Sequence, residues 1–179
     1  VWNRNHIDHV QIDVPETLSI EMRGSFYEQT GAFRDMVVTH LFQVLGFVAM
    51  EPPVSLDPKP LGREREKVFD SMTALAPDDA VRGQYVGYRE EDGVAADSET
   101  ETLVALRARV DNWRWEGVPF YLRAGKRMAQ SRHLLTIAFK QPPLRMFPLD
   151  CEQIVESFGH DHLTFELGDP GSISASFLA

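Results

Sequence analysis

The sequence predicts an α+β fold, in which a large, mainly antiparallel sheet is covered by helices on one face. Residues 102–110 alternate apolar and polar side chains with a period of two, which is typical of a strand in a sheet with one covered face. A long apolar segment of helical character occupies residues 26–53, and strand-like runs follow it in succession. One strand, then helices, then a run of strands is the order typical of α+β proteins.

The N-terminal part of the chain predicts a strand followed by a long helix. Residues 9–14 alternate apolar and polar side chains, as a half-buried strand does. In the segment 26–53 we expect the helix to begin at Thr30 and Gly31, with Thr30 as the candidate N-cap. The helix should end at Met50, because the prolines that follow cannot continue it.

The middle of the chain predicts a second helix between two connections. Residues 51–62 form a proline-rich connector, and residues 63–75 form a helix whose interleaved charges indicate a solvated face. Residues 89–101 are acidic and contain glycine, which favours a surface loop. Their carboxylates lack the spacing of a calcium-binding loop, so we expect no metal site there.

The remaining part of the chain predicts a succession of strands. After the strand at 102–110, four more are expected at residues 118–123, 133–140, 162–167 and 172–178. Lys126 lies in the connection between the first two of these four. Residues 168–171, Gly-Asp-Pro-Gly, are a strong turn signal between the last two.

The long helix carries one compact polar arc. At about 100° per residue, Asp35, Thr39, His40 and Gln43 fall inside an arc of roughly 140°, and the other positions are apolar. A helix that is apolar on nearly every side is expected to be buried, so its polar arc must meet other polar groups or line a cavity. An arc with an imidazole and a carboxylate is a candidate reaction site. The alternative is that Asp35 and His40 are core residues hydrogen-bonded to neighbouring backbone.

The bulk composition fits one soluble globular domain of ordinary size. The 179 residues are 43% hydrophobic and 25% charged, and the net charge of −9 argues against nucleic-acid or membrane partners. An anionic substrate would therefore need local cations. The single cysteine, Cys151, fits a reducing cytoplasm, and no run of apolar residues reaches membrane-spanning length. Glycine-rich nucleotide-binding motifs and zinc-ligand spacings are absent from the sequence.

Four segments of the chain match one family in order and spacing. They are residues 4–17 (RNHIDHVQIDVPET), the long helical segment 26–53, residues 82–88 (RGQYVGY) and residues 111–127 (DNWRWEGVPFYLRAGKR). Within the helix, the matching elements are Phe26-Tyr27-Glu28, Gly31, Arg34-Asp35, His40 and Ala49-Met50-Glu51. The chain thus resembles the substrate domain of the glucose-6-phosphate dehydrogenase family over about residues 2–147.

The resemblance implies roles for four residues. His40 matches the family's proton acceptor, and Asp35 matches a carboxylate that binds sugar hydroxyls. Glu16 matches a second substrate-binding carboxylate, and Lys126 matches a lysine that contacts the substrate. An imidazole suits the first role, because its ordinary pKa of about 6.5 leaves it largely neutral near pH 7. Without the resemblance, Glu16 is a turn residue and Lys126 a solvated loop cation.

Two positions depart from the family pattern. Many relatives carry a cation where this chain has Ser131, and they carry a substrate-binding glutamine where it has Gly168. A divergent paralogue that acts on another phosphosugar is therefore one alternative. A non-catalytic homologue that serves dimerisation or regulation is the other.

The resemblance also implies a wider setting for the chain. Residues 1–179 would be one substrate-binding and dimerisation domain, truncated at both ends, and an upstream Rossmann domain would bind NADP. The expected enzyme converts glucose 6-phosphate to 6-phosphogluconolactone in the pentose phosphate pathway, as a cytoplasmic homodimer or dimer of dimers. The cofactor-binding residues would lie outside the chain, and the isolated fragment should be inactive.

Overall fold

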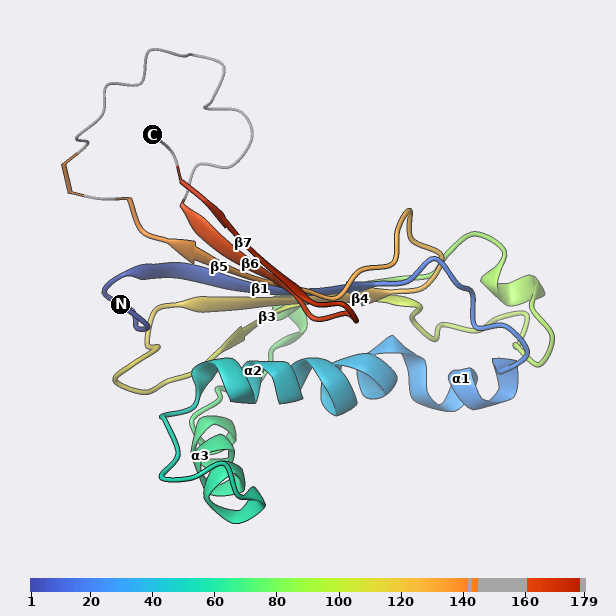
Figure 1. Ribbon diagram of the computed structural model, residues 1–179. Helices are drawn as coiled ribbons and strands as arrows, with labels where there is room; N and C mark the ends of the chain where they lie inside the picture. Colours follow the sequence, from blue (N-terminus) through green and yellow to red (C-terminus); the bar gives the residue numbers. More distant parts are fainter. Residues whose placement is uncertain (142, 145–160, 178–179) are drawn as a thin grey trace, which may run out of the picture.

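The fold is a single large sheet with helices on one face (Figure 1). The computed structural model describes residues 1–141, 143–144 and 161–177. Seven strands run in the order β2-β3-β4-β1-β5-β6-β7, and every neighbouring pair is antiparallel except β1 and β4, which are parallel. The strands are β1 (Ile7–Pro15), β2 (Ala80–Gly83), β3 (Leu103–Arg109), β4 (Pro119–Gly125), β5 (Leu134–Phe139), β6 (His162–Glu166) and β7 (Ser172–Ser176). The predicted α+β class is confirmed.

Six of the seven strands lie where the sequence predicts strands. β2 is the exception, because its four residues are too few to show a period and its place at the sheet edge depends on pairing with β3. The turn signal at 168–171 joins β6 and β7 as expected. Cys151 and residue 178, at the end of the last predicted strand, lie outside the described residues.

The long helix consists of three parts. They are α1 (Gly24–Ala32), a π-helix, η1 (Phe33–Leu41), and α2 (Phe42–Ala49). The predicted start at Thr30 and Gly31 lies at the break between an earlier helix, α1, which begins at Gly24, and η1. The predicted cap was wrong, because the Thr30 hydroxyl donates back to the Phe26 carbonyl at 3.2 Å. Gly31 interrupts the helix with φ 62° and ψ 175°, a conformation that favours glycine. The predicted end is confirmed, since Met50 is extended.

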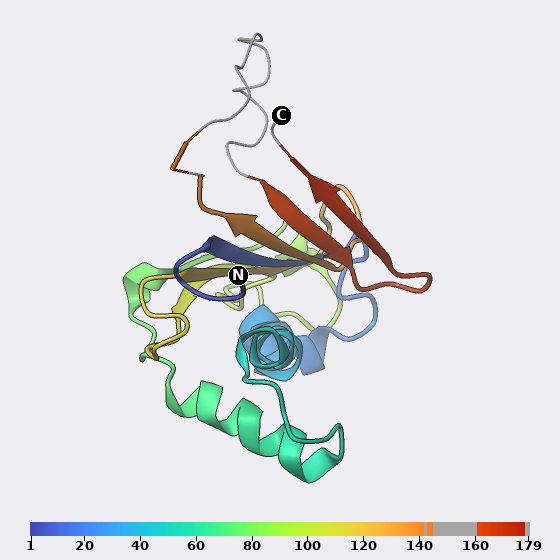
Figure 2. The same ribbon diagram turned by 60° about the vertical axis from the view of Figure 1, so that its left-hand side comes forward.

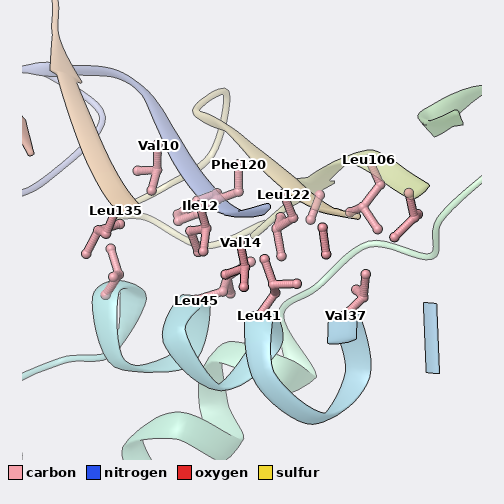
Figure 3. Packing of buried hydrophobic residues seen from close by; sticks show 14 of the residues in the cluster. Val10, Ile12, Val14, Val37, Leu41, Leu45, Leu106, Phe120, Leu122 and Leu135 are labelled. Carbon is pink, nitrogen blue, oxygen red and sulfur yellow. The ribbon is translucent and has the colours of Figure 1, made fainter. Parts of the chain in front are cut away.

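The long helix is not buried on every side. Val37, Leu41 and Leu45 are fully buried and point toward the sheet (Figure 3). Elsewhere on the helix, Val38 is 44% and Phe47 47% exposed, so the prediction of a helix buried on every side was wrong. The reason is that the sheet covers one face of the helix, as the end-on view makes plain (Figure 2).

By length and composition, the described helix Gly24–Ala49 could also cross a membrane. In the fold, however, this helix packs along the sheet, and 39% of its most apolar window is buried. Core helices of soluble proteins pass the same test of length and composition. The packing therefore favours a core helix.

The second helix is displaced from its predicted range. It is α3 (Pro58–Asp70), where we had expected residues 63–75. Pro58 occupies the first helical position after an extended Asp57, a start that suits proline because the first helical N–H needs no partner. The chain leaves the helix early because Met72 forms a β-bridge with Val110 at the edge of the sheet.

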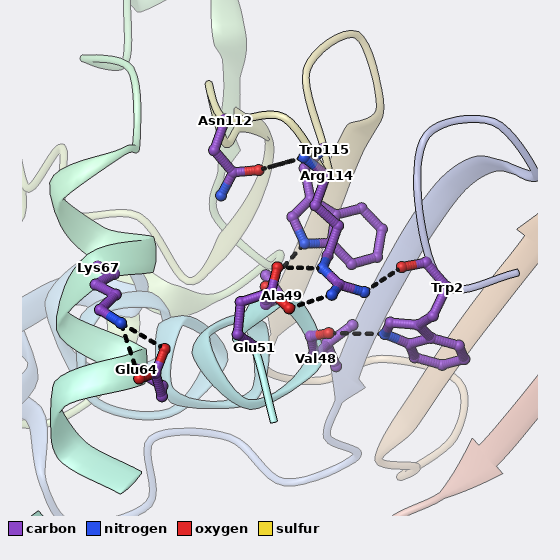
Figure 4. Close-up of polar contacts among 9 residues, drawn as sticks. All are labelled: Trp2, Val48, Ala49, Glu51, Glu64, Lys67, Asn112, Arg114 and Trp115. Atoms are coloured by element: carbon purple, nitrogen blue, oxygen red, sulfur yellow. Dashed lines mark hydrogen bonds and ion pairs between the residues drawn. The ribbon is translucent and has the colours of Figure 1, made fainter. Parts of the chain in front are cut away.

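Two tryptophans hold the C-terminal end of α2 against the sheet (Figure 4). The indole N–H of Trp115 donates to the Ala49 carbonyl at 2.8 Å, and that of Trp2 donates to the Val48 carbonyl at 2.9 Å. Arg114 pairs with Glu51 beside them. Carbonyls at a helix C-terminus lack intrahelical partners, so these donors satisfy groups that would otherwise be unpaired.

Candidate active site

Two of the predicted site residues meet at the end of the parallel pair of strands. β1 and β4 run side by side with Pro15 opposite Gly125, so the next residue of each chain segment emerges at the same edge. These residues are Glu16 and Lys126. Their side chains form an ion pair, with Glu16 Oε2 and Lys126 Nζ 2.5 Å apart.

The surroundings of Lys126 exclude a solvated loop cation. Only 5% of its side chain is exposed, compared with 25% of the Glu16 side chain. A lysine is rarely buried to this extent unless a carboxylate neutralises it. Lys126 is therefore a positioned charge, and the partly exposed Glu16 lies on its solvent side.

The loop that follows Lys126 is tied to the segment that carries Glu16. The Arg127 N–H donates to the Leu18 carbonyl at 2.9 Å, and the Met128 N–H donates to the Glu16 carbonyl at 2.8 Å. Ser131 completes this arrangement, because its hydroxyl accepts the Thr17 N–H at 2.8 Å. The serine that replaces the family's usual cation thus has a structural role in fixing the loop.

Asp35 and His40 lie together on the π-helix η1. His40 is exposed and Asp35 half-buried, and neither side chain has a hydrogen-bond partner among the described residues. The alternative that they are core residues bonded to neighbouring backbone is therefore wrong. π-Helical turns are rare and frequently occur at functional sites. Both groups are free to contact a ligand.

Tyr27 is a buried phenol whose pKa responds to carboxylates of both the helix and the sheet edge. Burial, together with the negative charges of Asp35, Glu101 and Glu16, raises the pKa of its hydroxyl well above the usual range. All three carboxylates therefore lie within electrostatic reach of one phenol. The Tyr27 hydroxyl is buried and has no hydrogen-bond partner among the described residues. Sequence reasoning gave Tyr27 no role, because an aromatic residue in an apolar helix predicts core packing.

The acidic segment 89–101 is anchored to α1, although most of its residues are exposed as predicted. The carboxylate of Glu28 accepts hydrogen bonds from the hydroxyls of Tyr88 and Ser98, both at 2.6 Å. Although burial raises the pKa of Glu28, these hydrogen bonds outweigh it and lower that pKa below its usual value. The acidic residue of the family motif thus fixes the loop.

Two further features bear on a ligand. Gly168 lies in the turn after β6, with open space where a side chain would extend, so it contributes no polar contact. Its neighbour Leu167 donates its N–H to the His133 carbonyl, at the end of the loop that contains Ser131. Among the residues that the structure describes, no cluster of His, Cys, Asp and Glu could hold a metal ion.

Comparisons with known proteins agree with this geometry. The sequence model described as "Glucose-6-phosphate dehydrogenase, C-terminal domain" matches residues 1–179. A glucose-6-phosphate 1-dehydrogenase 1 of Mycobacterium tuberculosis is 45% identical over 160 residues, which are 87% of this chain and 34% of the relative. The glucose-6-phosphate 1-dehydrogenase of Rhizobium meliloti is 45% identical over 170 residues, 86% of this chain and 34% of the relative.

Solved structures show the same similarity. The crystal structure of glucose-6-phosphate 1-dehydrogenase from Mycobacterium avium superposes with a TM-score of 0.90 at 39% identity, over 99% of this chain and 38% of the other. A glucose-6-phosphate dehydrogenase in complex with its substrate glucose-6-phosphate has a TM-score of 0.81 at 28% identity, over 99% and 40%.

The fold and the matches define the class of the chain: it is similar over its whole length to the C-terminal domain of known dehydrogenases. The chain belongs to the glucose-6-phosphate dehydrogenase family. It spans about a third of the length of the curated relatives that it matches.

Proposed function

We propose that the chain is the substrate-binding and catalytic-base domain of an enzyme that oxidises glucose 6-phosphate to 6-phosphogluconolactone and reduces NADP. One observation carries the proposal. A buried lysine–carboxylate pair, Lys126 and Glu16, lies at the end of the parallel strands, and the adjacent helix offers an unpartnered Asp35 and His40. This set contains a proton acceptor, acceptors for sugar hydroxyls and a local cation in a chain whose net charge is −9.

The chemistry assigns a task to each group. His40 would take the proton of the anomeric hydroxyl while the C–H bond breaks and its hydride leaves, so that a carbonyl forms at the anomeric carbon. Asp35 and Glu16 would accept hydrogen bonds from sugar hydroxyls, and Lys126 would donate to the substrate. The backbone at Glu16 and Lys126 is held by the hydrogen bonds already described, so these two groups are positioned before binding.

NADP would supply the acceptor for the hydride. The described residues contain no glycine-rich turn between a strand and a helix, so we assign the dinucleotide to a separate domain. NADP as the acceptor, a cytoplasmic location and a dimer built on the sheet follow from the family resemblance. The sheet face opposite the helices supports the last of these, because no helix among the described residues covers that face (Figure 1).

The test is a steady-state assay of the full-length protein. With glucose 6-phosphate and NADP we expect formation of NADPH, and with the isolated chain we expect none. Turnover by the isolated chain would contradict the assignment of the dinucleotide to a separate domain. No turnover by the full-length protein with this substrate would overturn the proposal.

A panel of sugar phosphates tests the divergent alternative. The Ser131 hydroxyl is engaged with Thr17 and Gly168 has no side chain, so two polar contacts of the family pattern are absent. Glucose 6-phosphate should still give the highest kcat/KM. A higher value for another phosphosugar would favour a paralogue with a different substrate.

A further inference from the structure

The start of the π-helix η1 is not capped by its own chain segment. The first backbone N–H groups of a helix have no intrahelical partners and need acceptors from elsewhere. Here the residue at the cap position is Ala32, whose side chain provides none. The acceptors come from Glu101, which is distant in sequence: its carbonyl accepts the Ala32 N–H at 2.9 Å, and its Oε1 accepts the Phe33 N–H at 2.9 Å.

The backbone of Gly31 is shaped for this contact. A Cβ atom at Gly31 would lie 2.6 Å from Glu101 Oε1, so only glycine allows the carboxylate to approach. Gly31 also has φ 62°, in the left-handed region that other residues rarely adopt. The Glu101 carboxylate can therefore occupy its position only because Gly31 forms the break between α1 and η1.

Glu101 is itself held by the sheet. The next residue, Thr102, is fully buried, and its N–H donates to the Gly83 carbonyl at 2.8 Å. The Thr102 carbonyl accepts the Lys126 N–H at 2.9 Å. Two consecutive residues thus connect the two halves of the candidate site, since Glu101 holds the helix of His40 and Thr102 holds the backbone of Lys126.

We propose that Glu101 is a positioning residue that fixes the first turn of η1 and thereby fixes Asp35 and His40 relative to Lys126. The inference rests on the proposed function and adds a residue to it. The position of the Glu101 side-chain oxygen should matter more than its charge, because that oxygen accepts a hydrogen bond from a backbone N–H of η1. Misplacing a catalytic group by about 1 Å can lower a rate by roughly a hundredfold, so a loose helix start should be visible in kcat.

The test compares substitutions of Glu101 in the full-length enzyme that change either the position of the side-chain oxygen or its charge. Glu101→Gln keeps the oxygen in place and removes the charge, whereas Glu101→Asp keeps the charge and withdraws the oxygen. We expect kcat close to the parent value for Glu101→Gln and roughly ten- to a hundredfold lower for Glu101→Asp. Glu99→Ala is the matched control, because Glu99 is exposed and has no interaction among the described residues.

A double-mutant cycle with His40 tests how Glu101 acts. In a His40→Asn background, Glu101→Asp should change kcat by less than about threefold, since the proton acceptor that it positions is gone and only its effect on Asp35 remains. Hydrogen exchange should show faster exchange of the Ala32 and Phe33 amides in Glu101→Asp and no change in the sheet.

The outcomes separate this inference from the proposed function. If the Gln variant is as slow as the Asp variant, or if the Asp effect persists in full without His40, the positioning role of Glu101 is wrong. If the parent enzyme does not oxidise glucose 6-phosphate, the proposed function is wrong. In that case, unchanged exchange at Phe33 in Glu101→Asp would also refute the Glu101 contact.

Discussion

Replacing Glu16 by Gln should destabilise the domain more than replacing Lys126 by Met. Breaking a buried ion pair by removing one partner costs about 3–5 kcal/mol, mainly because the other charge stays buried and unpaired. The two partners are not equally buried: the Lys126 side chain is 5% exposed and that of Glu16 is 25% exposed. Loss of Glu16 leaves the more buried charge, that of Lys126, without a partner. We therefore expect the free energy of unfolding to fall by about 3 kcal/mol for Glu16→Gln and by only about 1–2 kcal/mol for Lys126→Met.

Urea unfolding of the full-length protein measures both values, and the double variant Glu16→Gln/Lys126→Met completes the cycle. It should be less destabilised than the sum of the single variants by at least about 1 kcal/mol, because neither charge is left unpaired. Lys59→Met, at an exposed position of α3, is the matched lysine control and should change stability by less than about 0.5 kcal/mol. Additive single effects, or a larger loss for Lys126→Met, would refute the assigned burial of the pair.

The remaining predictions concern the candidate site and the ion pairs that Asp79 forms with Arg107 and Arg109. His40→Ala in the full-length enzyme should lower kcat by roughly a hundred- to ten-thousandfold without loss of stability, because the ring is exposed; an unchanged kcat removes His40 from the mechanism. Lys126→Ala should mainly raise KM for glucose 6-phosphate, since a contact present throughout the reaction acts as uniform binding; a fall in kcat alone contradicts this. Hydrogen bonds from Arg109, the Ala76 N–H and Arg107 lower the pKa of Asp79 from 3.8 to about 2. A lowered carboxylate pKa stabilises the fold above the unfolded pKa, and the contribution is lost as pH falls from about 4 to about 2. In Asp79→Asn, the free energy of unfolding should therefore fall less steeply between about pH 4 and pH 2 than in the parent, whereas Asp78→Asn, at an exposed position, should leave that slope unchanged.

Periodicity and turn residues were sufficient to predict most of the sheet. Strands β3, β4 and β5 follow their alternating patterns because each has one face against the helices and one face open. β2 could not be found this way, since a four-residue edge strand is defined by its partner β3. The start of α3 could have been read from Asp57 and Pro58, a pair that suits a helix N-terminus.

The long helix shows where sequence reasoning fails for a physical reason. Its composition predicts burial on every side, but burial depends on what lies around the helix, and in this structure the sheet covers one side only. Val38 and Phe47 are exposed, and composition cannot distinguish them from the buried Val37 and Leu41. Which apolar residues of the helix are exposed depends on how the helix packs against other elements, and a short stretch of sequence does not show that packing.

The resemblance supplied the proposed members of the candidate site but not the contacts between them. Glu16, Asp35, His40 and Lys126 were found by resemblance, yet the contact between Glu16 and Lys126 depends on the one parallel pair in the sheet, which alternation cannot reveal. The hydrogen bonds of Glu101 join residues far apart in sequence, and its acidic neighbours predict only a solvated loop. A reaction needs these connections as much as the groups themselves, because an unsupported imidazole on a half-exposed helix has no defined distance from the sugar. Thr102 and Glu101 join the helix and the strand end through consecutive residues, and under the proposed function the acidic loop would therefore contribute to the site without supplying a catalytic group.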